Sequence, residues 1–312
     1  MINNKNKLKI YSFYRFIRIY NKIKLKNKFQ LFLIDKKILG TILLSDEGIN
    51  GSLSGSKKDL DSMLVFIRKT LGIRKINLKI NKVDFFPFNR MKIRIKKEIV
   101  SLGKKEINVP KYTGKFISPE NWNNLIKKKN VKLIDTRNEY EFNIGHFTNA
   151  INPKTRSFRD FPKKISQLGI KKNDEVVMYC TGGIRCEKIS AFLKIEGYKN
   201  VSQLDGGILN FLENTKHTGN NNTWNGECFV FDNRVAVNKE LNIGSYDQCH
   251  GCRHPITQIE KSLKSFKKGV SCKYCYNKRS GKQKQNSSIR QEQIDKAESD
   301  NLHHPFKKIT FL

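Results

Sequence analysis

The stretch EVVMYCTGGIRCEKISAFLKIEGY, residues 175–198, contains the pattern that decides the fold of the central part of the chain. Its apolar run 175–180 predicts a buried strand, two glycines follow, and the segment 186–198 has the composition of a helix. Two further short apolar runs, 131–135 and 201–206, are separated from it by helical segments, and Ser118-Pro119-Glu120 is a typical helix start. Strands that alternate with helices predict a parallel sheet, so we expect residues 116–216 to form an α/β domain.

Cys180 stands at the end of this strand, where a turn leads into the helix. The turn's backbone N–H groups, the positive end of the following helix and the Arg185 guanidinium all favour thiolate over thiol. The sequence therefore predicts Cys180 as a nucleophile and Arg185 as its electrostatic partner; the alternative is an inert, buried cysteine. The residues expected to complete this active-site loop are Thr181, Gly182, Gly183 and Ile184.

Four further residues are predicted to support the loop. Asp135 and Arg137 follow the strand 131–135, and a structural ion pair is the favoured interpretation over direct chemistry. For His146 a hydrogen bond within a turn is favoured over proton transfer. Cys186, six residues after Cys180, either packs in the helix, which we favour, or resolves an oxidised Cys180.

The residues quoted above resemble a rhodanese domain over about residues 116–216. Asp135 and Arg137 match that family's pair at the active-site floor, Gly145-His146 matches its Gly-His turn, and 204–208 (LDGGI) matches its closing glycine turn. The C-x4-R spacing resembles sulfur-handling rhodaneses, whereas related phosphatase-like domains have one more residue between Cys and Arg. The resemblance implies that Cys180 can carry a persulfide.

Residues 1–101 are predicted to form a separate, basic α+β domain. Strand-like segments at 8–19, 37–55, 76–86 and 90–100 alternate with helical segments at 22–36 and 57–72. The resulting order β-α-β-α-β-β indicates a ferredoxin-like sandwich. Residues 102–115, with Gly, Pro and charged side chains, are expected to be a linker.

The 312-residue chain carries 61 Lys and Arg against 28 Asp and Glu, a formal net charge of +33. The first 115 residues account for 28 of the basic and only 8 of the acidic side chains. Such a surface favours a polyanionic partner, usually a nucleic acid, although a solvated lysine surface is the alternative. No apolar run is long enough for a membrane span or a secretory signal, so we expect a cytoplasmic protein that does not bind membranes.

Two longer motifs resemble the rhodanese-domain tRNA uridine hydroxylases over about residues 8–280. They are Asp46-Glu47-Gly48-Ile49-Asn50-Gly51 and the decamer 179–188 (YCTGGIRCEK), together with 229–232 (FVFD). The resemblance implies hydroxylation of the wobble uridine, position 34, to 5-hydroxyuridine, with O2 as co-substrate and the tRNA anticodon region as partner. Members of that family typically have His where this chain has Asp46. We interpret the motif as a turn in which Gly48 and Asn50 tolerate positive φ, with Glu47 beside them.

Two other functions stay open at this point. One is sulfur transfer from a Cys180 persulfide to tRNA or to a small thiol, and the other is a non-catalytic RNA-binding or sulfur-carrier module. No flavin fingerprint or non-haem iron triad is visible in the sequence, so the electron donor for a hydroxylation is unknown.

A cysteine-rich region is expected at residues 217–280. Cys249, Cys252, Cys272 and Cys275 have the spacing C-x2-C-x19-C-x2-C, which predicts a structural zinc site with His250 and His254 as substitute ligands. Disulfides and an iron–sulfur centre are the alternatives, and Cys228 is interpreted as structural. The polar segment 281–312 is expected to be a disordered tail.

Overall fold

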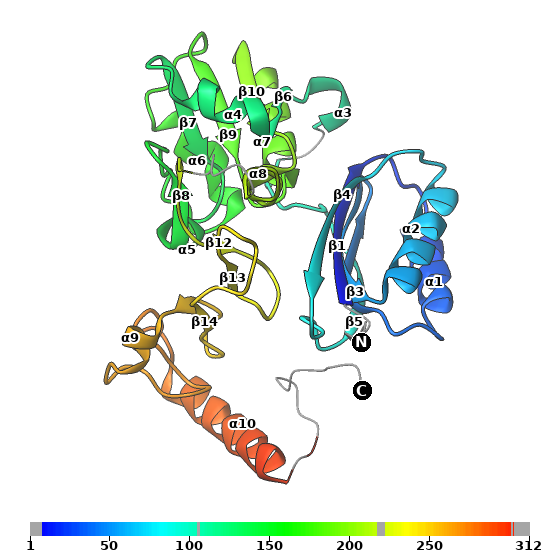
Figure 1. Cartoon of the computed structure of the whole chain (residues 1–312), viewed down its shortest axis with the longest axis vertical. Helices are drawn as coiled ribbons and strands as arrows, with labels where there is room; N and C mark the ends of the chain where they lie inside the picture. Colours follow the sequence, from blue (N-terminus) through cyan, green and yellow to red (C-terminus); the bar gives the residue numbers. More distant parts are fainter. Residues whose placement is uncertain (1–7, 105–106, 217–221, 301, 303–312) are drawn as a thin grey trace, which may run out of the picture.

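The computed structural model describes residues 8–104, 107–216, 222–300 and 302. It contains an N-terminal domain, a central domain and a C-terminal region, coloured blue to cyan, green, and yellow to red in Figure 1. The structure therefore has the mixed α/β and α+β architecture that the sequence predicts.

The N-terminal domain is a five-stranded sheet with two helices on one face (Figure 1). Its elements are β1 (Leu8–Phe16), α1 (Lys22–Phe32), β2 (Leu39–Ser45), β3 (Gly48–Gly55), α2 (Lys57–Leu71), β4 (Asn77–Val83) and β5 (Met91–Ile95). The strand order is β4-β1-β3-β2-β5, and only the β2–β5 pair is parallel. Helix α2 begins where the sequence predicts, because the Ser56 side chain accepts a hydrogen bond from the backbone N–H of Asp59 at 3.0 Å. The ferredoxin-like prediction is confirmed, except that the strand expected at 37–55 is a hairpin of two strands.

The face of this sheet that the helices leave open is turned toward the central domain (Figure 1). Successive side chains of β1 point to opposite faces of the sheet. Phe13 packs under the helices, and Tyr14 packs with Ala191 of the central domain. The sheet is therefore buried on both sides at this point.

The central domain has a parallel sheet in the order β6-β10-β9-β7, covered on both faces. The strands are β6 (Lys115–Ile117), β7 (Val131–Asp135), β9 (Glu175–Tyr179) and β10 (Asn200–Leu204). Helices α4 (Pro119–Ile126) and α8 (Gly207–Thr215) pack on one face, and α6 (Phe161–Ser166) and α7 (Ile184–Ile195) on the other. Shorter elements, α5 (Glu139–Ile144), β8 (Gly145–Phe147) and a 3₁₀ turn (Phe158–Asp160), complete the domain. Because the strands are parallel, Asp135, Cys180 and Gly206 all lie at the same edge of the sheet.

The described part of the segment 102–115 is packed rather than free. Leu102 and Val109 are buried, and the short helix α3 (Val109–Tyr112) contacts α7. The segment expected to be a linker thus joins the two domains through apolar contacts.

The C-terminal region differs from the expectation at both of its ends. Its strands are β11 (Trp224–Gly226), β12 (Cys228–Phe229), β13 (Ala236–Val237), β14 (Asp247–Gln248) and β15 (Pro255–Ile256), and α9 (Gln258–Lys261) follows. Strand β11 pairs with β8, and Trp224 and Cys228 lie in the core of the central domain, so this first part belongs to that domain.

Residues 281–299, expected to be disordered, form helix α10 (Gly281–Ser299). The Ser280 side chain caps the first turn, and Ile294 is buried. The Arg290 guanidinium donates to the carbonyl of Gly269 at 2.9 Å, which ties the helix to the cysteine-rich part. The helix is so polar that the few side chains making these contacts produce no hydrophobic helical period in the sequence. Residues 303–312 lie outside the described part.

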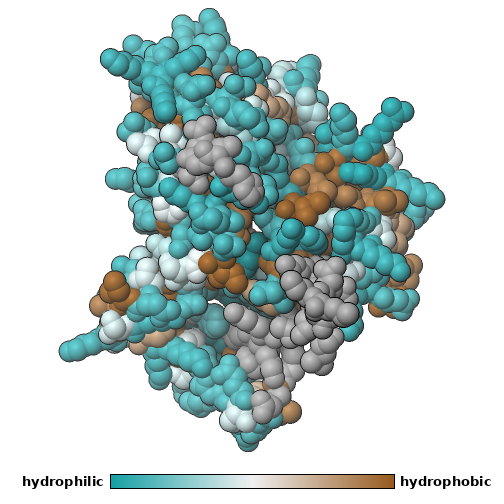
Figure 2. All heavy atoms as spheres, in the orientation of Figure 1, coloured by the Kyte–Doolittle hydropathy of each residue, from teal (hydrophilic) through white to brown (hydrophobic). Residues whose placement is uncertain are grey.

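Figure 2 shows a mostly hydrophilic surface, with the largest hydrophobic area over the N-terminal domain. Within the described residues, no helix is both long and apolar enough to cross a membrane.

Candidate active site

The loop after β9 folds around the sulfur of Cys180. The backbone N–H of Gly183 donates to the Cys180 Sγ at 3.1 Å, and α7 begins at the next residue. Gly183 has a φ of 95°, a conformation that favours glycine, and a Cβ there would lie 3.1 Å from the Tyr14 hydroxyl. A strand end, a glycine turn and a helix N-terminus therefore meet at one thiol.

The surroundings of Cys180 favour its thiolate, although only 1% of the residue is exposed. Burial alone raises the pKa of Cys180, but a hydrogen bond from the Cys186 thiol, the Arg185 charge and nearby backbone N–H groups outweigh it and bring the pKa to about 6. At neutral pH the sulfur is therefore largely anionic and nucleophilic.

Cys186 is a packed helix cysteine with one further role. Its Sγ lies 3.3 Å from the Thr136 hydroxyl, and burial together with the Cys180 charge raises the pKa of Cys186 well above its usual value. It therefore stays a thiol and donates to the neighbouring thiolate. Cys228 is buried against Thr181 of this loop, and burial raises its pKa to about 12, in agreement with a structural residue.

Arg185 is held by a carboxylate rather than by loop carbonyls. Its two terminal nitrogens donate to the Glu141 carboxylate at 2.8 and 2.6 Å, and both side chains are buried. Glu141 also accepts from the backbone N–H of Asn138 at 3.1 Å, which caps helix α5. The sequence reasoning missed Glu141; the signal was a capping-box spacing, Asn138-x-x-Glu141, directly after the Asp135–Arg137 pair.

Asp135 and Arg137 form the buried structural ion pair that the sequence favoured. The closest contact, between Arg137 Nη2 and Asp135 Oδ2, is 2.7 Å, and the same nitrogen donates to the carbonyl of Gly145 at 2.6 Å. His146 Nδ1 lies 3.0 Å from the Phe142 carbonyl, and its ring stacks on Phe142. These residues hold the floor of the site and do not reach the thiol.

The Glu47 motif packs against the helix that follows Cys180. Glu47 accepts from Lys188 Nζ at 2.6 Å and from the backbone N–H of Ile99 at 2.7 Å. Lys188 also donates to Glu98 at 2.7 Å, and the Tyr14 hydroxyl donates to Glu187 at 2.8 Å. The two motifs thus meet, since Glu187 and Lys188 end the decamer that begins at Tyr179.

The turn before β3 needs glycine at one position only. Gly48 has a φ of 148°, and a Cβ there would lie 2.1 Å from the Arg15 carbonyl oxygen. The expectation of positive φ at Asn50 is wrong, because Asn50 is an ordinary β3 residue whose side chain donates to the Ile99 carbonyl at 3.0 Å. Asp46 pairs with Lys22 on an exposed surface, so it does not face the thiol loop.

One exposed aromatic ring lies beside the loop. Phe231 is 64% exposed, and its ring centroid lies 5.7 Å from the guanidinium carbon of Arg185. Nearby, the backbone of Asn233 donates to the Pro87 carbonyl at 3.0 Å, which connects this segment with the N-terminal domain. An exposed ring beside Arg185 is suited to stack on a planar substrate.

The four cysteines of the C-terminal region come together as predicted. Their Sγ atoms all lie within 4.8 Å of one another, with Cys252–Cys272 at 3.7 Å and Cys272–Cys275 at 3.9 Å. A tetrahedral zinc with Zn–S bonds of about 2.3 Å requires S–S separations of about 3.8 Å, so the donor set fits a metal such as zinc. All seven cysteines are free thiols, and neither His250 nor His254 belongs to this group. His254 instead stacks on Tyr274, with ring centroids 3.5 Å apart.

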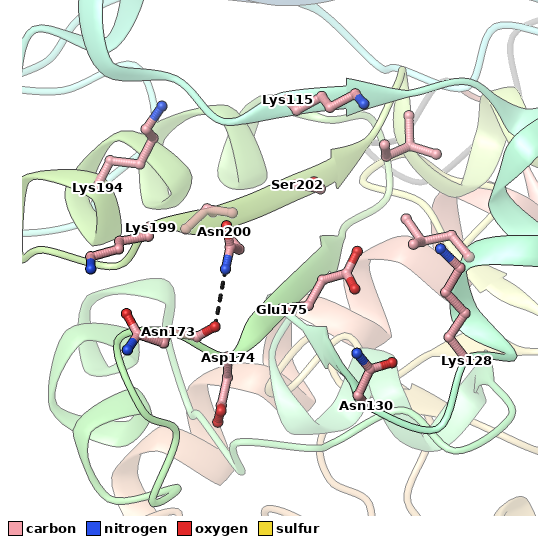
Figure 3. A pocket seen from close by; sticks show the side chains of 13 residues that line it. Lys115, Lys128, Asn130, Asn173, Asp174, Glu175, Lys194, Lys199, Asn200 and Ser202 are labelled. Carbon is pink, nitrogen blue, oxygen red and sulfur yellow. Dashed lines mark hydrogen bonds between the residues drawn. The ribbon is translucent and has the colours of Figure 1, made fainter.

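A cavity of about 690 Å³ lies at the opposite edge of the central sheet (Figure 3). It is lined by residues at the amino ends of the strands, among them Lys115, Glu175 and Asn200. Because Cys180 follows the carboxyl end of β9, this cavity is separate from the thiol loop.

In a comparison with known protein families, the N-terminal and the central domain match two different families. Residues 8–99 match the family described as the UPF0176 acylphosphatase-like domain, and residues 118–214 match the rhodanese-like domain.

Among solved structures, the chain is similar to a rhodanese-like domain protein from Staphylococcus aureus, with 24% identity, 31% of this chain and 90% of that chain covered, and a TM-score of 0.27. It is also similar to a polysulfide-sulfur transferase from Wolinella succinogenes, with 21% identity, 34% and 80% covered, and a TM-score of 0.30. By the two family models, the chain combines a UPF0176 acylphosphatase-like N-terminal domain with a rhodanese-like domain, and Cys180 lies within the latter.

Proposed function

We propose that this protein is a tRNA-modifying oxidoreductase that hydroxylates the wobble uridine to 5-hydroxyuridine with O2. The observation that carries the proposal is the contact between the two motifs. Glu47 of the N-terminal domain and Lys188 of the Cys180 helix form an ion pair at 2.6 Å, and Lys188 is buried. A sulfurtransferase loop alone has no need of this basic domain fastened to its helix.

The lowered pKa of Cys180 supports an attack on the pyrimidine. In the proposed reaction the thiolate adds to uracil C6, and the C5–C6 π pair moves through the ring to O4, which becomes an enolate oxygen. C5 then reacts with O2 to give a hydroperoxide, and an external two-electron donor reduces its O–O bond to hydroxyl and water. Loss of the C5 proton and departure of the Cys180 thiolate restore the C5–C6 double bond.

Charge and aromatic exposure support RNA as the substrate. The first 115 residues hold 28 basic side chains against 8 acidic ones, which suits a phosphate backbone. Phe231 offers a face on which an unstacked base can rest, a contact worth about 1–3 kcal/mol in single-stranded recognition.

Sulfur transfer from Cys180 is the second candidate, and a specific contact favours it. The Gly183 N–H points at the sulfur at 3.1 Å, and the same donor suits a bound sulfane sulfur. Transfer to tRNA would leave a sulfur-containing nucleoside, whereas hydroxylation adds oxygen and depends on O2.

The test is mass spectrometry of nucleosides from tRNA of cells that lack the gene and carry either the wild-type protein or Cys180→Ser. We expect 5-hydroxyuridine or its derivatives with wild type only, since a serine hydroxyl is not anionic at neutral pH. The modification should also disappear from anaerobic cultures. Full activity of Cys180→Ser, or a thiolated nucleoside in place of the hydroxylated one, contradicts the proposal.

A further inference from the structure

Lys79 of the N-terminal domain reaches the turn after β10, which packs against the thiol loop of the central domain. In the sheet, Asn77 lies opposite Tyr14 and Lys79 opposite Ser12, so alternation places Asn77 and Lys79 on the face that Tyr14 uses. Tyr14 and Asn77 both donate to Glu187, at 2.8 and 3.3 Å. Lys79 is therefore on the docked face, one step further along β4.

The end of the Lys79 side chain lies over Gly206. A Cβ on Gly206 would be 2.3 Å from both Cε and Nζ of Lys79, so the end of the lysine lies directly against the Gly206 backbone. Gly206 is part of the Cys180 site: its Cα lies 3.6 Å from a Cβ built on Gly183, and two residues later Ile208 donates to the Cys180 carbonyl at 2.9 Å. The ammonium is thus held over Gly206, next to the thiol loop.

Three other cations near the loop are paired with close carboxylates. Arg185 is paired with Glu141 at 2.6 Å, Arg137 with Asp135 at 2.7 Å, and Lys188 with Glu47 at 2.6 Å. Among the described residues, Lys79 makes no salt bridge within 4.0 Å. Burial lowers its pKa, and the more distant charge of Asp205 offsets this only in part. A half-buried ammonium of this kind is stabilised when an anion binds beside it.

We infer that Lys79 forms a subsite beside Cys180 for an anionic oxygen of the substrate. The identity of this oxygen rests on the proposed function. It is either the enolate O4 that appears when the thiolate adds to C6, with the Lys79 ammonium donating a hydrogen bond to it, or a phosphodiester oxygen next to the reacting nucleotide. Lys79 is in either case a binding residue that the N-terminal domain contributes to a site on the central domain.

The test uses two reagents of nearly equal size on the full chain, the anionic iodoacetate and the neutral iodoacetamide. Alkylation of the Cys180 peptide is followed by mass spectrometry in wild type, Lys79→Gln and Lys82→Gln. Lys82 is on the same strand, exposed and oriented to the other face, so its variant makes the same change in net charge. Melting temperatures establish that all three proteins are folded.

We expect Lys79→Gln to lower the ratio of iodoacetate to iodoacetamide rates about fivefold, the order expected for one unit charge close to the reagent in a partly hydrated site. Lys82→Gln should keep the wild-type ratio. An unchanged ratio in Lys79→Gln, or an equal fall in both variants, overturns the subsite.

A tRNA assay identifies the oxygen. A lower kcat of Lys79→Gln at unchanged KM supports the enolate oxygen, and a higher KM at unchanged kcat supports the phosphodiester; wild-type values for both overturn the subsite. If wild-type protein leaves tRNA unmodified, the proposed function fails, while the reagent ratio still decides whether the subsite exists.

Discussion

Replacing Cys186 with Ala should raise the pKa of Cys180, because the Cys186 thiol is the strongest of the groups that lower it. A hydrogen bond to a charged group contributes about 1.5–3 kcal/mol, and a thiol is a weak donor, so we take the lower end of this range. With 1.36 kcal/mol per pKa unit, the pKa should rise by about one unit. The midpoint would move from about 6 to about 7.

The assay is the rate of iodoacetamide alkylation of the Cys180 peptide against pH, read by mass spectrometry. Only the thiolate reacts, and a lowered pKa means that this form dominates at all pH values above it. At pH 6.5 the thiolate fraction should fall from about three quarters to about one quarter, so alkylation slows about threefold. At pH 9 both proteins are fully ionised and should react at equal rates.

Two controls isolate the hydrogen bond from the loss of a buried side chain. Cys186→Ser keeps a hydrogen-bond donor and should titrate near wild type and retain substantial activity. Cys228→Ala removes a buried cysteine that contacts Thr181 but is not among the groups that set the pKa of Cys180, so it should leave the midpoint at about 6. A wild-type midpoint in Cys186→Ala would refute the assignment of Cys186 as the donor.

Three further predictions concern the loop, the exposed ring and the cysteine cluster. Arg185→Lys cannot make both bonds to Glu141, so the free energy of unfolding should fall by about 2 kcal/mol in urea titrations and the Cys180 midpoint should rise. Phe231→Ala should lower kcat/KM for tRNA about tenfold, as expected for one lost stacking contact, while Phe231→Tyr stays near wild type. Wild type should contain one zinc per chain by elemental analysis; Cys249→Ser should release it, make residues 240–280 protease-sensitive and weaken tRNA binding more than it slows chemistry.

Each of the three has an outcome that contradicts it. For Arg185→Lys the contradicting outcome is a wild-type pH profile of Cys180 alkylation. For Phe231→Ala it is a fall in kcat/KM together with an equal fall in the rate of iodoacetamide alkylation, because that result indicates a disturbed loop and not the loss of a stacking contact. For the cluster it is wild-type protein without stoichiometric metal and with four freely titratable thiols. Cys228→Ala serves as the zinc control, since Cys228 lies outside the cluster.

The features that follow from sequence alone are the local ones. The run 175–198 shows its strand, glycine turn and helix in the order of its residues, and the structure has them at the predicted places. The Ser56 cap of α2 and the spacing of the four C-terminal cysteines were predictable for the same reason: each depends on residues a few positions apart or on two short knuckles.

The tertiary structure alone decided which distant groups meet at the site. Glu141 binds Arg185 across 44 residues of sequence, Glu47 binds Lys188 across 141, and Lys79 lies over Gly206. Helix α10 likewise depends on contacts such as Arg290 with Gly269. Periodicity and turn residues specify a backbone conformation within a segment, but they carry no information on which segment will face it. The partner of a buried charge is set by how whole domains pack, and in this protein that packing joins the thiol loop to the N-terminal domain.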